Sequence, residues 1–414
     1  MSRNGHTLAA AFVCAATLFT AGNSLAQTYE NPFDRPITAQ LRCWYKQSAG
    51  QANLATGYVD ASDFALRGRW QGISTIHEGA LFFTLQEPEE VNQACRRALD
   101  AAGKDTLVQA SAAGGPWGKN FQIWYDGDVA AYRGRPVERI VSFGDSLSDT
   151  GNIYNEFRQT FPIHTSWFLG RFSNGPVWTE YLSRRTGLPL NTWATGGAQS
   201  DNAYGIINGV KSQVDSFIAY TRRNVNRYDI GRTLFTVWIG GNDAMNGRQA
   251  RDVVADLDTA LNDLVDHGAR KIVLLGVPDL TRAPAFRSID GMDGTGRHDS
   301  DEVYATVAQL NEVLPQLAQR VSERTDAQVV WIDAAKHFDN VLADPGAYGF
   351  ADVTRPCLDL RSQGSQVYLS TQSVRKDCIP ERNVFWDMVH PTTRMHELMS
   401  RWVLADLPSA WDLR

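Results

Sequence analysis

From Val137 onward, short apolar segments alternate with amphipathic helical patterns, and this alternation constrains the fold more than any other feature of the sequence. The segments expected to be strands are residues 139–143, 190–194, 233–239, 271–276 and 328–332. The segments expected to be helices are residues 177–186, 210–223, 250–267, 300–325 and 392–404. Buried strands that alternate with helices form a parallel sheet with helices on both faces. The sequence therefore predicts a three-layer α/β/α domain over residues 136–414.

Residues 27–135 have a different character and predict a separate, small α+β domain. Segments 78–85 and 121–125 are rich in apolar and aromatic residues, which is typical of strands, and residues 91–102 have the pattern of a helix. The run Ser-Ala-Ala-Gly-Gly-Pro at 111–116 predicts a loop. A domain of this size has a small core, so a covalent link would stabilise it.

The first 26 residues predict a secretory signal peptide. Arg3 precedes an apolar stretch from about Leu8 to Ala21, and small residues up to Ala26 offer a cleavage site. The apolar stretch is shorter than the ~20 residues that a membrane-spanning helix needs. Cleavage near Ala26 would export the chain to the periplasm or to the extracellular space.

Export to an oxidising compartment would allow the cysteines to form disulfides. Four of the five follow the expected signal peptide, namely Cys43, Cys95, Cys357 and Cys378. An even number in an oxidising compartment predicts two disulfides, and although three pairings are possible, proximity favours Cys43–Cys95 and Cys357–Cys378. No two cysteines have the C-x-x-C spacing, so the sequence predicts no metal site.

Charge and motifs exclude several other classes of function. The net charge is −6, which argues against a nucleic-acid partner because phosphate binding needs a basic surface. The chain has no Walker A loop, no H-E-x-x-H pair and no dinucleotide fingerprint, and no cofactor is expected. The acidic segment 290–296 has spacing that hints at calcium but fails the EF-hand pattern, so a solvated loop is predicted.

Polar residues and glycines that follow three of the expected strands could together form an acyl-transfer site. Ser146 follows the first strand, Gly197 the second and Asn242 the third. Each alone is typical of a turn or a helix cap. Because the carboxyl ends of parallel strands meet at one edge, the three are expected to lie close together. They would then supply a nucleophile and donors for an oxyanion.

A general base is predicted near the carboxyl end of the chain. His390 follows Asp387 by three residues, a spacing that lets the carboxylate hold one nitrogen of the ring while the other faces the serine. The alternative is that Asp387 caps the final helix and His390 is a loop residue. Among the other histidines, His337 is the strongest rival for the base because it follows the strand at 328–332.

The run Phe143–Asn152 (Phe-Gly-Asp-Ser-Leu-Ser-Asp-Thr-Gly-Asn) and the segment 174–182 resemble blocks of the GDSL or SGNH hydrolases. Within that family the chain is similar to the branch of thermolabile haemolysins, secreted phospholipases A and glycerophospholipid–cholesterol acyltransferases. The resemblance covers about residues 137–408 and implies a flavodoxin-like three-layer domain that needs no cofactor. Ser148 replaces the last glycine of a G-x-S-x-G elbow, which disfavours an ordinary α/β-hydrolase.

The family pattern also assigns roles to the matched positions. It implies Ser146 as nucleophile, Asp387 and His390 as the orienting and basic partners, and Ser146, Gly197 and Asn242 as the oxyanion hole. Gly196 is the less suited member of its glycine pair. These roles would make the chain a serine esterase that works through an acyl-enzyme.

The resemblance implies a secreted enzyme that hydrolyses acyl esters of phospholipids or lysophospholipids, with acyl transfer to another alcohol as a further activity. Its partners would be the ester substrate and a lipid surface. Two alternatives remain open from the sequence. The same chemistry would serve a carbohydrate acetyl esterase, and an aromatic-rich first domain would serve a lipid- or glycan-binding protein with a degenerate hydrolase domain.

Overall fold

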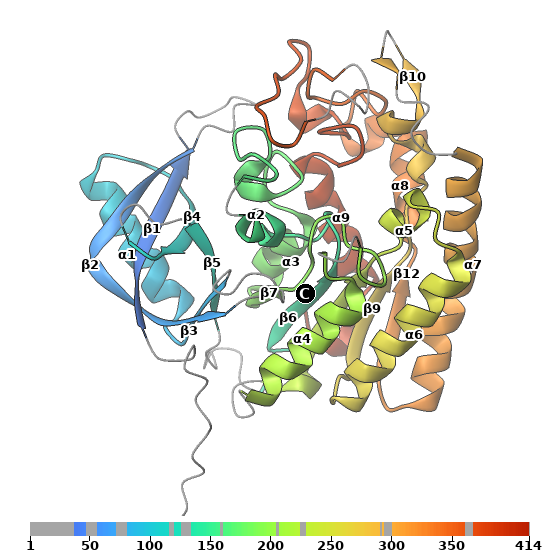
Figure 1. Cartoon of the computed structure of the whole chain (residues 1–414), viewed down its shortest axis with the longest axis horizontal. Coiled ribbons are helices and arrows are strands. Elements are labelled where there is room, and N and C mark those ends of the chain that lie inside the picture. The colour runs from blue at the N-terminus through green and yellow to red at the C-terminus, as the bar shows by residue number, and fades with distance from the viewer. Residues whose placement is uncertain are drawn as a thin grey trace, which may run out of the picture.

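The computed structural model describes residues 37–46, 56–71, 81–115, 120–125, 134–157, 160–203, 207–223, 229–289, 292–293, 300–360 and 367–413. They form a small closed barrel followed by an α/β/α domain (Figure 1). Within these ranges no helix is long and apolar enough to cross a membrane. The expected signal peptide, its cleavage near Ala26 and the domain boundary at 135 stay predictions, and most of the acidic loop 290–296 lies outside the described residues.

The barrel contains β1 (Ile37–Lys46), β2 (Thr56–Gln71), β3 (Leu81–Thr84), β4 (Leu107–Ala113), β5 (Asn120–Tyr125) and α1 (Pro88–Ala101). Its strand order is β1-β2-β3-β5-β4, and β4 pairs with β1 to close it. The β3–β5 pair is parallel and the other pairs are antiparallel. A closed five-stranded barrel with a helix between its third and fourth strands has the topology of an OB-fold.

The sequence-based expectations do not include three strands of the barrel, namely β1, β2 and β4. The loop predicted at 111–116 is wrong at its start, because residues 111–113 belong to β4. Their small side chains, Ser111, Ala112 and Ala113, are fully buried on both faces of the strand, and because side chains alternate, Ala112 packs in the barrel core while its two neighbours face away from it. A run of small residues therefore marked close packing here and not a turn.

Both expected disulfides are present. Cys43 of β1 is bonded to Cys95 of α1, with 5.2 Å between their Cα atoms, and this bond ties the helix to the barrel. Cys357 is bonded to Cys378, with 5.3 Å between Cα atoms, and closes a loop of the second domain. The first bond is the covalent link that the small core of the barrel was expected to need.

The second domain is built on β6 (Arg139–Gly144), β7 (Leu190–Thr192), β8 (Thr233–Trp238), β9 (Lys271–Leu275) and β12 (Gln328–Ile332). These strands are all parallel and lie in the order β12-β9-β8-β6-β7. Numbered along the chain from β6, the order is 2-1-3-4-5, which is the flavodoxin-like arrangement. All five expected strands are confirmed.

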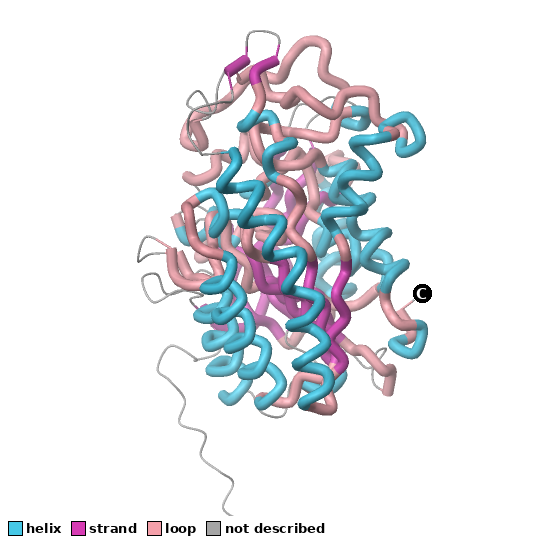
Figure 2. Tube along the Cα trace, turned by 90° about the vertical axis from the view of Figure 1, so that its right-hand side faces the viewer, coloured by secondary structure: helices cyan, strands magenta, loops and turns pink. Residues whose placement is uncertain are grey.

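Helices cover both faces of this sheet (Figure 2). On one face α4 (Val210–Arg223), α6 (Ala250–Asp266) and α7 (Ser300–Arg324) pack side by side. On the other face α3 (Trp178–Thr186) packs against α9 (Thr393–Asp406). The five expected helices are confirmed with small shifts at their ends. The expectations did not include α2 (Asn152–Glu156), α5 (Gly241–Met245), α8 (Ala334–Ala343) and the short pair β10 (Ser288–Ile289) and β11 (Met292–Asp293).

Aromatic side chains join the barrel to the α/β/α domain. Phe83 of β3 stacks on Tyr220 of α4 with ring centroids 4.5 Å apart. Trp124 of β5 meets the edge of Trp193, just beyond β7, at 5.1 Å. Because these rings are buried in the same core cluster as the sheet, the barrel has a fixed position beside β6 and β7.

Candidate active site

The site lies outside the carboxyl ends of the parallel strands, at the point where the strand order reverses. In a flavodoxin-like sheet, ligands bind outside the carboxyl ends of the first and third strands. Here those strands are the neighbours β6 and β8. Ser146 follows the end of β6 by two residues, and Asn242 lies in α5, directly after β8. The strand order therefore brings these two residues, nearly 100 positions apart, to the same crevice.

A glycine at the end of β6 makes the turn that presents the serine. Gly144 has φ = +151°, and a Cβ at this position would lie 2.3 Å from the carbonyl oxygen of Trp238. The side chain of Gln213 accepts from the Gly144 N–H and donates to its carbonyl, both at 2.9 Å. Only glycine fits this turn, and the turn places Ser146 at the mouth of the crevice.

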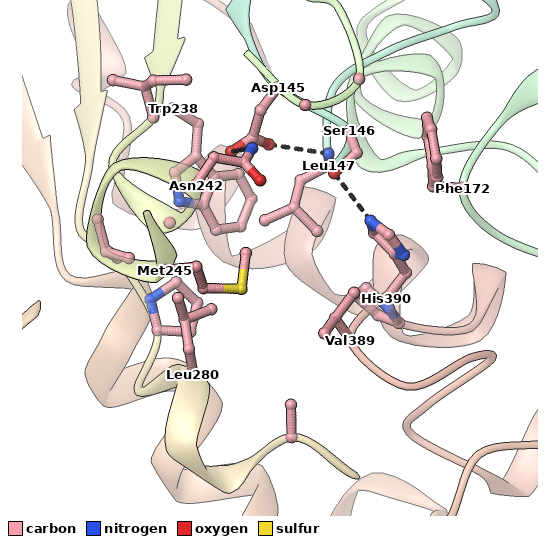
Figure 3. Close-up of a pocket in the computed structure, with 18 of the residues that line it drawn as sticks. Asp145, Ser146, Leu147, Phe172, Trp238, Asn242, Met245, Leu280, Val389 and His390 are labelled. Atoms are coloured by element: carbon pink, nitrogen blue, oxygen red, sulfur yellow. Dashed lines mark hydrogen bonds between the residues drawn. The ribbon is translucent and has the colours of Figure 1, made fainter. Parts of the chain in front are cut away.

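Ser146, His390 and Asp387 form one hydrogen-bonded line, of which Figure 3 shows the bond between Ser146 and His390. The Oγ of Ser146 lies 2.8 Å from Nε2 of His390. The Nδ1 of the same ring lies 2.9 Å from each carboxylate oxygen of Asp387. This arrangement of hydroxyl, imidazole and carboxylate can transfer a proton from the serine to the histidine.

A tight loop aligns the aspartate and the histidine. The backbone N–H of Trp386 donates to the carbonyl of His390 at 2.8 Å, which closes the loop. Inside it, Asp387 Oδ1 accepts from the backbone N–H groups of Val389 and His390 at 2.9 and 2.8 Å. The alternative role for Asp387 is excluded, because the side chain of Thr392 caps α9.

The Asp387 carboxylate has one more donor, Trp167, whose indole Nε1 donates to Oδ2 at 2.8 Å. Burial by itself would raise the pKa of Asp387, but the charge and hydrogen bond of His390 and the other donors outweigh it, so the pKa is lowered. Asp387 therefore stays ionised although it is fully buried, and an ionised carboxylate at Nδ1 is able to stabilise a positive imidazole ring.

The rival histidine lies elsewhere. The Nε2 of His337 lies 2.8 Å from a carboxylate oxygen of Asp406, and its ring stacks on Trp402 with centroids 4.9 Å apart. Neither contact belongs to the cavity at Ser146. The structure thus brings His390 and not His337 to the serine.

The two glycines after β7 use their backbone N–H groups differently: that of Gly196 is bonded within the protein, and that of Gly197 is open to the cavity side. Gly196 N–H donates to Asp149 Oδ2 at 2.7 Å, and a Cβ on Gly196 would lie 2.3 Å from the ring of Phe172. Gly197 has φ = +79°, and within the described part of the chain its N–H has no hydrogen-bond partner. Gly197 is therefore the member of the pair that can donate to a substrate.

Asp149 ties the loop after β6 to the loop after β7. Besides Gly196 N–H it accepts from the backbone N–H groups of Gly151 at 2.7 Å and Ile153 at 3.1 Å. The neighbouring Asn152 donates to the carbonyls of Thr192 and Ala194. These bonds fix the position of the glycine pair relative to Ser146.

Asn242 is anchored at the opposite side of the crevice. Its Nδ2 donates to the carbonyl of Ala198 at 2.9 Å and lies 3.4 Å from Oδ2 of Asp145, so the second amide hydrogen has only a long contact. The next residue, Asp243, is fully buried and accepts from the backbone N–H and the hydroxyl of Ser200 at 3.0 and 2.8 Å. This clamp joins α5 to the loop that carries Gly197.

Asp145 is a buried carboxyl beside these donors. Burial raises its pKa to about 7, although the Leu147 N–H and the positive charge of His390 act in the opposite direction. Its Oδ1 accepts from Leu147 N–H at 3.0 Å. The carboxyl therefore holds the turn around Ser146 and changes charge near neutral pH.

A cavity of about 420 Å³ opens at Ser146 and is lined mainly by apolar side chains. In Figure 3 Leu147, Met245, Leu280 and Val389 surround it on one side of the Ser146–His390 pair, and Phe172 lies on the other side. A volume of this size is in the range of sites for small organic ligands. The cavity can hold an apolar chain whose polar end reaches the serine.

The sequence analysis missed residues that support the site. Asp149 lies within the run 143–152, and an acidic side chain among glycines and an asparagine is a common acceptor for loop N–H groups, but the sequence analysis assigns it no role. No local signal identifies Trp167 or Asp243 as partners of the site, because each acts on a residue or loop far away in the sequence.

Comparisons with known proteins agree with this geometry. Residues 140–403 match the family described as GDSL-like Lipase/Acylhydrolase, and residues 17–126 match the Vibrio dual lipase/transferase, N-terminal domain. The chain is 35% identical over 373 residues to a thermolabile hemolysin of Vibrio parahaemolyticus, covering 88% of this chain and 86% of that protein.

Two further relatives match about two thirds of the chain. A phosphatidylcholine-sterol acyltransferase of Aeromonas hydrophila is 30% identical over 323 residues, which cover 66% of this chain and 91% of that protein. The secreted effector protein SseJ of Salmonella typhimurium is 27% identical over 275 residues, covering 63% and 61%. Since the family match spans more than half of the sequence, the chain belongs to the GDSL-like lipase/acylhydrolase family and is a lipolytic ester hydrolase.

Proposed function

We propose that this hydrolase is exported and cleaves the acyl esters of phospholipids and lysophospholipids, with Ser146, His390 and Asp387 as its catalytic residues. One observation carries the proposal: the hydrogen-bonded line of these three side chains ends at the apolar cavity. The line supplies a nucleophile, and the cavity suits an acyl chain. The names of the relatives support a lipid substrate.

The reaction begins at Ser146. His390 Nε2 takes the hydroxyl proton while Oγ attacks the ester carbonyl, and the carbonyl π electrons move to oxygen to form an oxyanion. Asp387 stabilises the imidazolium. When the intermediate collapses, the C–O bond to the leaving alcohol breaks and His390 returns the proton to that alcohol. The acyl group remains on Ser146.

The oxyanion needs donors that are already in place. The N–H groups of Ser146 and Gly197 have no hydrogen-bond partner within the described residues, and the amide of Asn242 has one hydrogen with only a long contact. Removing one such donor from a hydrolase costs about 10²–10³ in rate. These three groups form the proposed oxyanion hole.

The acyl-enzyme can react with water or with another alcohol. Water gives a fatty acid, and an alcohol gives a new ester by the same steps in reverse. Two findings support transfer to an alcohol. Residues 17–126 match a family described as the N-terminal domain of a dual lipase/transferase, and one relative is named as a sterol acyltransferase. Export is supported by the sequence of residues 1–26 and by the relative named as a secreted effector.

Product analysis by mass spectrometry tests the proposal. The full-length mature chain would be incubated with dioleoylphosphatidylcholine or lysophosphatidylcholine, with and without cholesterol, in parallel with acetylated xylan. We expect oleic acid and lysophospholipid, a cholesteryl ester when cholesterol is present, and no acetate release above background. Ser146→Ala should abolish all products. Acetate release with no fatty acid would instead favour the carbohydrate esterase.

A further inference from the structure

Exposed apolar side chains occur on the two segments that carry the cavity-lining rings Phe161 and Tyr368. Phe157 is 38% exposed, Val367 45% and Leu369 63%, and they make up three of the eight large apolar side chains that are exposed in the described part of the chain. Phe161 contacts Phe157, Tyr368 lies between Val367 and Leu369 in the sequence, and these two rings line the cavity. We call these five residues the apolar lip.

A series of ring contacts links the apolar lip to His390, the proposed catalytic base. The rings of Phe157 and Phe161 have centroids 5.8 Å apart, and those of Phe161 and Tyr368 are 5.2 Å apart. Tyr368 in turn lies 6.3 Å from the ring of His390. An apolar path therefore leads from solvent-exposed Phe157 to the residue that faces Ser146.

Hydrogen bonds hold the two loops of the lip together. Ile163 N–H donates to the carbonyl of Tyr368 at 2.8 Å, and Gln372 N–H donates to the hydroxyl of Ser166 at 2.7 Å. The disulfide Cys357–Cys378 closes the second loop behind them. In Figure 1 the orange-red loops of this region lie beside the green loops near α2. Val367 and Leu369 are therefore displayed on a loop that is fixed at several points.

We propose that the apolar lip docks on the surface of a lipid aggregate and delivers the ester from it to Ser146. This inference rests on the proposed phospholipid substrate. When an acyl chain leaves a lipid aggregate through water, each CH₂ group that becomes exposed costs about 0.8 kcal/mol of free energy. A lip seated in the interface removes that water, and its rings give the chain an apolar route into the cavity.

The barrel is the alternative docking surface, because Ile37, Tyr58 and Leu85 are also exposed there. None of them lines the cavity or has a ring contact that leads to it. Leu85 is 52% exposed and is the same residue type as Leu369, so it provides a matched control. A charge placed at either position should be equally tolerated by the fold.

The experiment measures binding separately from catalysis. All proteins in this experiment carry Ser146→Ala, so that they bind lipid without cleaving it. The parent, which has no further change, is sedimented with vesicles of dioleoylphosphatidylcholine and compared with the variants Leu369→Glu, Val367→Glu and Leu85→Glu. We expect the two lip variants to bind about tenfold or more weakly, since each loses an apolar contact and places a charge at the interface. Leu85→Glu should bind like the parent.

The same substitutions in the active enzyme give the second readout. Hydrolysis of vesicles should fall about tenfold more in the lip variants than hydrolysis of dissolved p-nitrophenyl butyrate. Equal vesicle binding by the lip variants and the parent, an equal loss in Leu85→Glu, or no vesicle binding by the parent would each overturn the docking proposal. Vesicle binding without cleavage of a dissolved short-chain phosphatidylcholine would instead refute the proposed substrate and leave the docking surface standing.

Discussion

Trp167 donates its indole N–H to a carboxylate oxygen of Asp387 across 220 positions of sequence, at a distance of 2.8 Å. Both side chains are fully buried. The bond fixes the carboxylate that in turn orients His390. Trp167 does not line the cavity, and its hydrogen bond to the site is the one to Asp387, although its ring also packs against cavity-lining Tyr368 with centroids 4.8 Å apart.

Trp167→Phe should therefore lower kcat and leave KM for a small dissolved ester unchanged. A hydrogen bond to a charged group contributes about 1.5–3 kcal/mol, which sets the expected loss at roughly 10–100-fold. Steady-state kinetics with p-nitrophenyl butyrate measure both constants.

Trp178→Phe is the matched control. Trp178 is also fully buried, but its indole N–H donates to Ser148 Oγ at 3.0 Å and not to the catalytic line. We expect it to reduce thermal stability with little loss of kcat. Equal losses of kcat in the two variants would mean that buried tryptophan packing, and not the bond to Asp387, supports the reaction.

Asn242→Ala should reduce kcat/KM by about 10²–10³ because it removes one proposed oxyanion donor. Asn340→Ala, at an exposed position of α8 that does not line the cavity, is the control and should stay within a few-fold of the parent. Binding of a fluorophosphonate probe would report whether Ser146 remains reactive. A loss of less than tenfold in Asn242→Ala would remove the amide from the oxyanion hole.

The main elements of the site could be predicted because they belong to local patterns. The run around Ser146 and the three-residue spacing of Asp387 and His390 are visible within a few residues, and the alternation of strands and helices predicts that their positions meet. The contact between Trp167 and Asp387 has no local pattern, since it depends on how two distant loops pack. The same holds for the clamp between Ser200 and Asp243.

Parts of the fold escaped prediction for a related reason. The helices α2 and α5 have five residues each, too few to show a helical period. In the barrel, β4 ends in small residues that resemble a turn, yet pairing with β1 and β5 makes them a strand. Pairing with neighbouring strands therefore outweighs the local preference of these small residues for a turn.

Met245→Trp should shorten the acyl chains that the enzyme accepts. Met245 lies on the side of the cavity away from Phe172 (Figure 3), and a larger ring there would exclude the end of a long chain. Exclusion of two CH₂ groups costs about 1.6 kcal/mol, so the ratio of kcat/KM for a palmitoyl ester to that for a butyryl ester should fall roughly tenfold or more. The butyryl ester is the internal control. An unchanged ratio would place the acyl chain on the side of Phe172.

His396 of α9 makes the stability of the fold depend on pH. Its ring is fully buried, and within the described residues neither nitrogen has a hydrogen-bond partner. Burial, with a smaller contribution from the charge of His390, lowers its pKa to about 3. The folded state therefore requires the neutral ring, whereas the unfolded chain binds a proton below a pKa of about 6.5.

Because the folded pKa is the lower one, this contribution to stability is complete above pH ~6.5 and is lost as the pH falls toward 3. The loss is about 1.4 kcal/mol per pH unit, or about 2 kcal/mol at pH 5. His396→Leu should abolish it, so the free energy of unfolding should change less between pH 7 and pH 5 than in the parent. Urea denaturation with the disulfides intact measures this difference. Met395→Leu, at another fully buried position of α9 whose side chain does not titrate, is the control and should keep the parent's dependence. If His396→Leu loses as much stability as the parent over that range, the buried ring accepts a proton in the folded state, and other groups cause the acid sensitivity.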